Sequence, residues 1–204
     1  MSLSSRKIRK LFGKTPTDPR QFLTHYTTTN SAGAEIGVWM GDFSEMVLST
    51  GSIAKYYLID PYEFMPQFPN RMYGGKVAQN QGDMDEIFER TQSRLAHLPG
   101  EKIFVRKRSA EAASAVPDES LDFVYVDGNH YYDGVQADIL SYLGKLKTGG
   151  FLIFDDWNWH DDEGKASVKQ AVCDFIAANP GCLQLVDLQA GQAVFLVTSN
   201  RLKS

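Results

Sequence analysis

The sequence lacks the features of several protein classes. No apolar run approaches the roughly 20 residues that a membrane-spanning helix needs, and no apolar stretch follows the basic N-terminus as a secretory signal requires. There are two cysteines, Cys173 and Cys182, and neither belongs to a CxxC motif or a Cys/His cluster. This usage indicates a reducing, cytoplasmic location. Cys173 falls within a helical pattern, where we expect it to be buried. No internal repeat and no interdomain linker is visible.

An excess of positive charge is also missing. The 204 residues carry a net charge of −4, so a general affinity for nucleic acid is not expected. The charge is uneven, because residues 1–30 hold six basic and one acidic residue. We interpret residues 1–30 as a basic N-terminal extension, solvated and partly ordered, that could contact a partner or an anionic substrate. The length and the hydrophobic content of 43% suit a single domain, residues 31–204.

Short apolar runs alternate with helical patterns along this domain. After the fifth run, the spacing of apolar residues over 168–176 predicts a helix, and two final runs around Gly191 predict a hairpin. The alternation predicts an α/β fold: a seven-stranded, mostly parallel, doubly wound sheet with an antiparallel last strand and helices on both faces. The predicted strands are 34–39, 55–60, 103–105, 121–127, 151–156, 183–188 and 193–197.

The stretch 34–44 reads as a strand, a glycine turn and the start of a helix. Gly37 and Gly41 stand four apart, and such a turn brings backbone N–H groups close to a ligand. It is not GxGxxG, because Trp39 stands two residues before Gly41. Asp60 ends the second strand about 20 residues later, where an acid accepts hydrogen bonds from a ribose diol. The alternative is that Asp60 merely ends a strand before a proline.

Acidic residues gather at the ends of the predicted strands. Parallel strands share one carboxyl edge, so Asp127, Asp155 and Asp156 should lie near one another. Three carboxylates there could hold Mg²⁺ or a similar hard cation. In the alternative reading, Asp127 binds cofactor or substrate and the other two cap the next loop.

Two histidines follow these acids. His130 comes three residues after Asp127 and is the first candidate for a general base; a loop hydrogen bond or a substrate contact is the alternative. His160 is the second candidate, whereas His25 and His97 are expected at the surface. The aromatic connection 61–82, together with two tryptophans after the fifth strand, could wall an acceptor pocket or simply pack.

Four strings together resemble a known family. They are EIGVWMGDFSE, YYLIDPYEF, SLDFVYVDGNHYYDGVQADI and LKTGGFLIFDDW. Over residues 34–198 the chain resembles the class I S-adenosylmethionine-dependent methyltransferases with their Rossmann-like fold. In particular it resembles the methyltransferase domain 24 group, which is similar to macrocin-type and catechol-type O-methyltransferases.

The resemblance implies a cofactor site and a metal site. The residues at the methionine and sulfonium end of the cofactor would be Glu35, Gly37, Trp39, Gly41 and, at the start of the helix, Ser44. Asp60 would bind the ribose, and Ser109 and Ala110 would flank the adenine. Asp127 would border the cofactor. In the catechol-type enzymes a metal is held at the positions of Asp127, Asp155 and Asp156, the last being an amide there. The catalytic lysine of that family falls on His130, and this departure leaves the identity of the base open.

The sequence therefore predicts a metal-assisted O-methyltransferase. The expected cofactors are S-adenosylmethionine and Mg²⁺ or another divalent cation, which would lower the pKa of the acceptor hydroxyl. The expected partner is a small hydroxylated molecule, without nucleic acid or membrane, and a homodimer is the oligomer we consider. Two alternatives stay open: a protein that binds S-adenosylmethionine without transferring its methyl group, and an NAD-dependent oxidoreductase.

Overall fold

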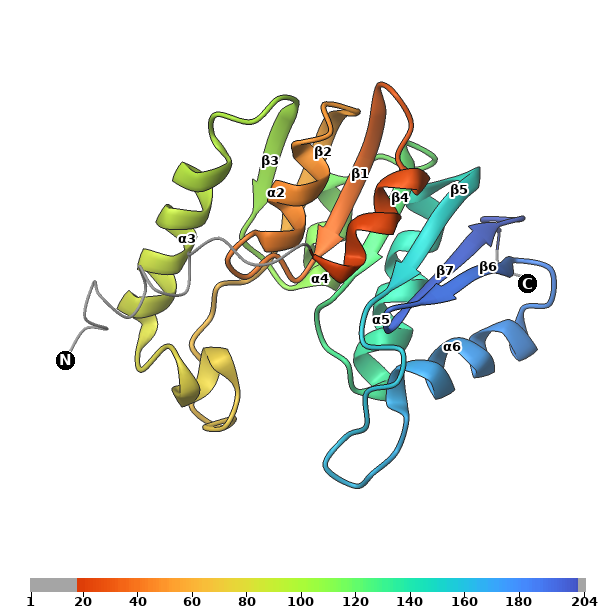
Figure 1. The fold of residues 1–204 in the computed structure, drawn as a ribbon. Coiled ribbons are helices and arrows are strands. Elements are labelled where there is room, and N and C mark those ends of the chain that lie inside the picture. The colour runs from red at the N-terminus through yellow and green to blue at the C-terminus, as the bar shows by residue number, and fades with distance from the viewer. Residues whose placement is uncertain (1–17, 202–204) are drawn as a thin grey trace.

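The computed structural model describes residues 18–201, which form one seven-stranded sheet with helices on both faces (Figure 1). The strand order is β3-β2-β1-β4-β5-β7-β6, with β7 antiparallel to both of its neighbours and all other pairs parallel. The predicted fold class is confirmed. The strands are β1 (Ser31–Ile36), β2 (Ile53–Ile59), β3 (Glu101–Val105), β4 (Leu121–Val126), β5 (Leu146–Phe154), β6 (Leu183–Gln189) and β7 (Gln192–Val197).

The helices divide between the two faces of the sheet. Leu23, Phe43, Val47 and Leu95 belong to one buried cluster, which places η1, α2 and α3 on one face, while α4, α5 and α6 pack on the other. Figure 1 shows η1 in red in front of the sheet and α5 behind it. The helices are η1 (Pro19–Tyr26), α2 (Asp42–Leu48), η2 (Met72–Lys76), α3 (Gln81–Leu95), α4 (Ser109–Ala112), η3 (Ala113–Ala115), α5 (Tyr132–Tyr142), η4 (Leu143–Lys145) and α6 (Ser167–Ala178).

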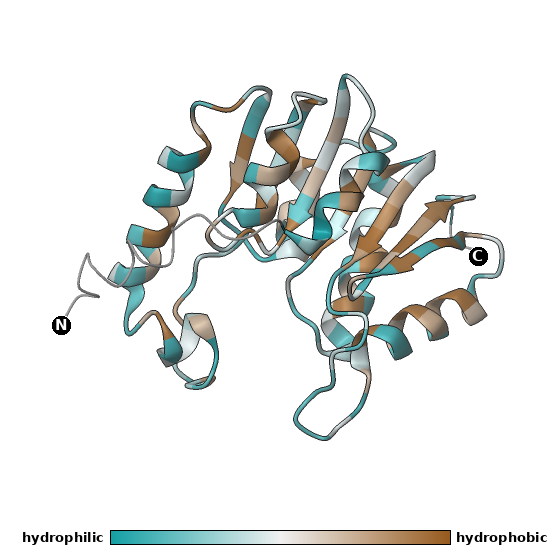
Figure 2. Cartoon of the chain, viewed as in Figure 1, coloured by the Kyte–Doolittle hydropathy of each residue, from teal (hydrophilic) through white to brown (hydrophobic). Residues whose placement is uncertain are grey.

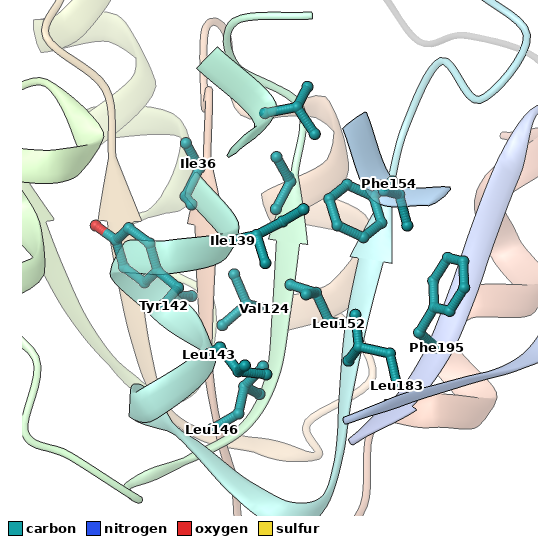
Figure 3. Close-up of a cluster of buried hydrophobic side chains, with 14 of the residues drawn as sticks. Ile36, Val124, Ile139, Tyr142, Leu143, Leu146, Leu152, Phe154, Leu183 and Phe195 are labelled. Carbon is teal, nitrogen blue, oxygen red and sulfur yellow. The ribbon is translucent and has the colours of Figure 1, made fainter. Parts of the chain in front are cut away.

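The core follows the apolar periodicity of the sequence. In Figure 3, Ile139 of α5 lies over Val124 and Leu152 of the central strands. The banding of α3 and α6 in Figure 2 reflects one apolar and one polar side of each helix. Strands β5 and β7 are mostly hydrophobic in Figure 2. Both lie inside the sheet, where helices and neighbouring strands surround them.

Three local expectations change. Strand β1 ends at Ile36, three residues before the predicted end, because Gly37 has a φ of 89° and turns the chain. Residues 19–26, assigned to a solvated extension, form η1 and bury Leu23 in the core; residues 1–17 of that extension lie outside the described residues. Cys173 is exposed, because the buried side of α6 is formed by its neighbours Ala171 and Val172.

Within residues 18–201, no helix combines the length and the apolar character that crossing a bilayer requires.

Adjacent residues of α5 allow a matched test of the packing. Ile139 is fully buried, whereas the side chain of Leu140 is 55% exposed. We expect Ile139→Ala to lower the free energy of unfolding by about 2–5 kcal/mol, because it removes buried methyl groups and leaves a cavity. Leu140→Ala, with the same change in helix propensity to within a few tenths of a kcal/mol, should alter it by roughly 0.5 kcal/mol or less. Urea unfolding of both variants measures the difference, and equal losses would contradict this packing.

Candidate active site

At the carboxyl edge of the parallel strands, the first residue after β1, β2, β4 and β5 is hydrogen-bonded to the last residue of a neighbouring strand. The N–H of Gly37 donates to Ile59 O at 2.9 Å, and that of Asp127 donates to Ile36 O at 2.8 Å. Asp155 N donates to Val126 O at 3.0 Å and Asp60 N to Val105 O at 3.3 Å. The residues that the sequence places at the strand ends therefore do share one edge. The connections after β2 and β5 extend beyond this edge (Figure 1).

The glycine turn is held by Asp60. Its carboxylate accepts hydrogen bonds from Trp39 N at 2.9 Å and from Tyr62 N at 2.8 Å. Trp39 has a φ of 50°, and its carbonyl accepts a hydrogen bond from Tyr62 Oη at 2.8 Å. Both backbone polar groups of Trp39 are therefore bound, the N–H by Asp60 and the carbonyl by Tyr62. Burial raises the pKa of Asp60 above its usual value, and the backbone N–H groups that it accepts from oppose this. Gly41, with a φ of 77°, precedes the first residue of α2.

Two predicted cofactor residues, Glu35 and Ser44, are hydrogen-bonded to each other. Glu35 is buried on the α2 side of the sheet, where it accepts from Ser44 Oγ at 2.6 Å and from Tyr56 Oη at 3.0 Å. Burial raises the pKa of Glu35 to about 8. The three side chains fix the start of α2 against β1 and β2, and thereby the shape of the turn.

The predicted adenine residues begin α4. Ser109 Oγ donates to Asp138 of α5, and Ser109 O accepts from Tyr142 Oη at 2.8 Å, whereas Ala110 is exposed. Burial raises the pKa of Asp138 to about 6. A hollow of about 360 Å³ lies between the chain segments that follow Asp60 and precede Ser109. Its lining residues are Pro61, Tyr62, Glu63, Gln81, Arg106, Lys107, Arg108 and Glu111.

His130 lies between two of the predicted acids. Its Nε2 is 3.3 Å from Asp127 Oδ1 and its Nδ1 is 3.6 Å from Asp156 Oδ2. Nε2 is buried and finds no hydrogen-bond partner in residues 18–201. Burial opposes protonation of His130, but the surrounding carboxylates, Asp127 first, outweigh it, so its pKa lies above the usual value. For Asp127, burial has the opposite effect and raises its pKa to about 7, although the neighbouring His130 opposes this rise.

Asp155 and Asp156 do not complete a metal site with Asp127. Both oxygens of Asp155 are engaged: Oδ2 accepts from Tyr125 Oη at 2.8 Å, and Oδ1 accepts from Asp156 N at 2.7 Å and from the Gln192 amide. The side chain of Asp156 is 51% exposed and points to His130. Between residues 18 and 201, no group of three or more His, Cys, Asp or Glu is arranged to hold a metal ion. The donor set therefore does not fit the predicted divalent cation.

Sequence reasoning missed the cation that does lie at this edge. Arg20 of η1 places Nη1 3.3 Å from Tyr125 Oη, 3.7 Å from Asp127 Oδ2 and 3.8 Å from Asp155 Oδ2. Its only sequence signal is the Asp18-Pro19 helix start, in which Asp18 caps the N–H of Arg20 at 2.8 Å. Nothing local indicates a contact with residues more than 100 positions away.

Three loops meet above His130. Trp159, after β5, lies 5.7 Å from the His130 ring and 5.3 Å from the Tyr131 ring, measured between centroids. The Arg71 guanidinium, after β2, stacks 5.5 Å from the centre of the Trp159 ring, and its Nη2 donates to Tyr131 Oη at 3.2 Å. Of the two candidate tryptophans, Trp159 thus borders the site and Trp157 packs on Phe195. His160, His25 and His97 are exposed, as expected for the last two.

Comparisons with known proteins agree with the fold. The solved structures similar to this chain include cofactor-bound Rv0187 from MTB (TM-score 0.64, 14% identity, 91% of this chain and 82% of that chain) and the O-methyltransferase NovP (TM-score 0.58, 17% identity, 84% and 73%). A rRNA methylase from Streptococcus thermophilus also has this fold (TM-score 0.57, 12% identity, 91% and 100%).

Sequence comparison gives the family. The uncharacterized protein y4gI of Sinorhizobium fredii is 31% identical over 72 residues, which are 35% of this chain but 8% of that protein, so the chain spans a small part of this relative. A methyltransferase domain model, that of the domain 24 group, matches residues 34–157. This stretch is more than half of the chain and holds the glycine turn, Asp60, Asp127 and Asp155; the chain therefore belongs to the methyltransferase domain family.

Proposed function

We propose that this chain transfers a methyl group from S-adenosylmethionine to an oxygen atom of a small hydroxylated acceptor, with His130 as the general base. The observation that carries the proposal is the buried Nε2 of His130, which lies at the strand edge beside Asp127 and has no hydrogen-bond partner within residues 18–201. An imidazole nitrogen without a hydrogen-bond partner keeps the capacity to accept a proton from a ligand that reaches it.

The residues at the edge of β1 and β2 suit the cofactor. Asp60 is an acid at the end of β2, where a ribose diol donates its hydrogen bonds. Gly37 brings the turn against the segment after β4, since a Cβ there would lie 2.1 Å from Asp127 O. The turn and His130 therefore belong to one small region. When bound there, S-adenosylmethionine supplies an electrophilic methyl group on its sulfonium.

On the acceptor side of the site, one proton would be transferred to the base. The acceptor hydroxyl would lose its proton to Nε2 of His130 as its oxygen forms a bond to the methyl carbon, and the electrons of the broken carbon–sulfur bond stay on sulfur. Asp127, whose Oδ1 lies 3.3 Å from Nε2, would stabilise the imidazolium that results. Trp159 and Tyr131 border this region and would exclude water from it.

The competing functions differ in what they bind and release. Calorimetry with S-adenosylhomocysteine and with NAD⁺ separates a methyltransferase from the oxidoreductase. Methyl transfer from labelled S-adenosylmethionine to a panel of catechols, sugars and amines, with rRNA as a further acceptor, then tests turnover. The net charge of −4 favours the small acceptors. Binding of S-adenosylhomocysteine without transfer to any acceptor would favour the non-catalytic alternative. A homodimer and a cytoplasmic location stay predictions.

Replacing the two histidines distinguishes the candidate bases. His130→Gln should lower kcat by about 10²–10⁴-fold, the usual contribution of a general base, and leave the affinity for S-adenosylhomocysteine unchanged. The matched control is His160→Gln, because His160 is exposed and should not affect kcat. Steady-state kinetics and calorimetry on both variants measure this. A large loss in His160→Gln with none in His130→Gln would reverse the assignment.

The pH dependence follows from the raised pKa of His130. Only the neutral imidazole accepts a proton, so kcat should rise with pH, with its midpoint above the ordinary histidine value of 6.5. Asp127→Asn removes the main negative neighbour, which lowers the pKa of His130 and moves the midpoint to lower pH. Asp118→Asn, at an exposed acid paired with Lys145, is the control and should not move it. A midpoint that shifts upward in Asp127→Asn is incompatible with His130 as the base.

Two glycines with positive φ test the contact between the turns. Gly37→Ala and Gly51→Ala impose similar backbone strain, at φ values of 89° and 72°. The new Cβ at position 37 would lie 2.1 Å from Asp127 O, whereas nothing lies within 4 Å at position 51. We expect Gly37→Ala to weaken S-adenosylhomocysteine binding by about tenfold or more and Gly51→Ala to leave it unchanged. Calorimetry decides, with thermal unfolding as the check that both variants fold.

A further inference from the structure

Arg20 stands where the sequence predicts a divalent cation. Its side chain is 18% exposed, and Nη1 lies within 4 Å of three oxygens, one each on Tyr125, Asp127 and Asp155. The two carboxylates come from the ends of neighbouring strands, and leaving both charged and buried would be costly without a positive charge. The guanidinium supplies that charge from within the chain.

The guanidinium is held in one orientation. Asp18 accepts from Nε at 3.0 Å and from Nη2 at 2.7 Å, which occupies the edge that faces away from the strands. The face of the group lies 5.4 Å from the centre of the Phe43 ring, and that ring stacks on Tyr125 with centroids 3.7 Å apart. Nη1 is thereby left directed at the acids, a geometry that a flexible surface arginine would not keep.

The acids beside Arg20 are arranged for hydrogen bonds and not for a metal. Asp155 accepts from Tyr125, Gln192 and a backbone N–H, and Asp156 turns toward His130. A cation site would need their free oxygens to converge with those of Asp127, within about 2.0–2.6 Å of one point. With Arg20 in place, a second positive charge would also be repelled.

We propose that Arg20 is a built-in replacement for a divalent cation: it compensates Asp127 and Asp155, positions Asp127 beside His130, and makes the site independent of metal. The inference rests on the proposed function for its catalytic meaning, while the charge replacement itself is a property of the folded chain. Arg20 is a positioning residue in this scheme, because it reaches the base only through Asp127.

Manganese binding tests the replacement without cofactor or acceptor. In Mn²⁺ titrations of the full chain followed by electron paramagnetic resonance, the wild type should bind no stoichiometric Mn²⁺ at the edge. Arg20→Gln leaves two carboxylates uncompensated, and without the guanidinium their oxygens can turn toward a cation. This variant should bind Mn²⁺ about tenfold or more tightly than the wild type, since attraction replaces repulsion. Arg20→Lys, which keeps the charge, should show no such gain. The double variant Arg20→Gln/Asp155→Asn should lose it.

Matched controls and opposing outcomes complete the experiment. Arg90→Gln removes a surface arginine that pairs with Glu86 on α3 and should behave as the wild type. The inference is overturned if the wild type binds Mn²⁺ in a manner abolished by Asp155→Asn, or if folded Arg20→Gln shows no gain. If Arg20→Gln does not fold, the Mn²⁺ titration of the wild type decides alone. Failure of S-adenosylhomocysteine binding would instead refute the proposed function and leave this result standing.

With turnover established, kinetics give the second readout. Wild-type kcat should be unaffected by EDTA, Arg20→Gln should lower kcat by about tenfold with an unchanged KM for S-adenosylmethionine, and Arg20→Lys should restore most of it. A purely structural role would lower thermal stability without this separation of kcat from KM. Loss of wild-type activity in EDTA would overturn the inference.

Discussion

The turn after β1 and the segment after β4 meet backbone to backbone, and the site depends on that contact. Asp127 N donates to Ile36 O at 2.8 Å, and the carbonyl of Asp127 lies so close to Gly37 that no side chain would fit at position 37. The strand order reverses between β1 and β4, so the helices that follow these two strands pass to opposite faces of the sheet, and open α/β sheets bind their ligands at such a point. A cofactor bound at the turn would therefore lie beside the segment that carries His130.

Charge at this edge is balanced by the chain itself. Asp60 is bound by backbone N–H groups, Asp155 by Tyr125 and Gln192, and Asp127 lies between His130 and Arg20. Deeper in the sheet, burial raises the pKa of Glu35 to about 8, and this shift toward the neutral form lessens the need for a cation beside it. The edge thus collects several acids while few of them remain as isolated buried charges, which is what stability demands.

The sequence predicted what is encoded locally and missed what is encoded across the sheet. Strands such as β4, with its apolar run at residues 123–126, are recognisable because a buried parallel strand is mostly apolar. The edge position of Asp127, Asp155 and Asp60 followed from topology. Whether their oxygens converge did not, because that depends on partners such as Tyr125 and Gln192, which pack from other strands. Arg20 was missed for the same reason: its role depends on contacts with distant residues, and the local charge pattern indicated a partly ordered basic extension that could contact a partner or an anionic substrate.

The division of the site between local and distant residues separates its two tasks. The glycine turn and Asp60 lie within residues 34–157, the stretch that defines the family, and they would bind the donor. Arg20 lies outside that stretch, on a helix that packs on the α2 face of the sheet through Leu23 and Phe22. A change in the segment before β1 could therefore alter the charge around Asp127 without disturbing the turn. In such an arrangement the donor would be bound by the matched domain stretch, while the charge around Asp127 is set by the segment that precedes it.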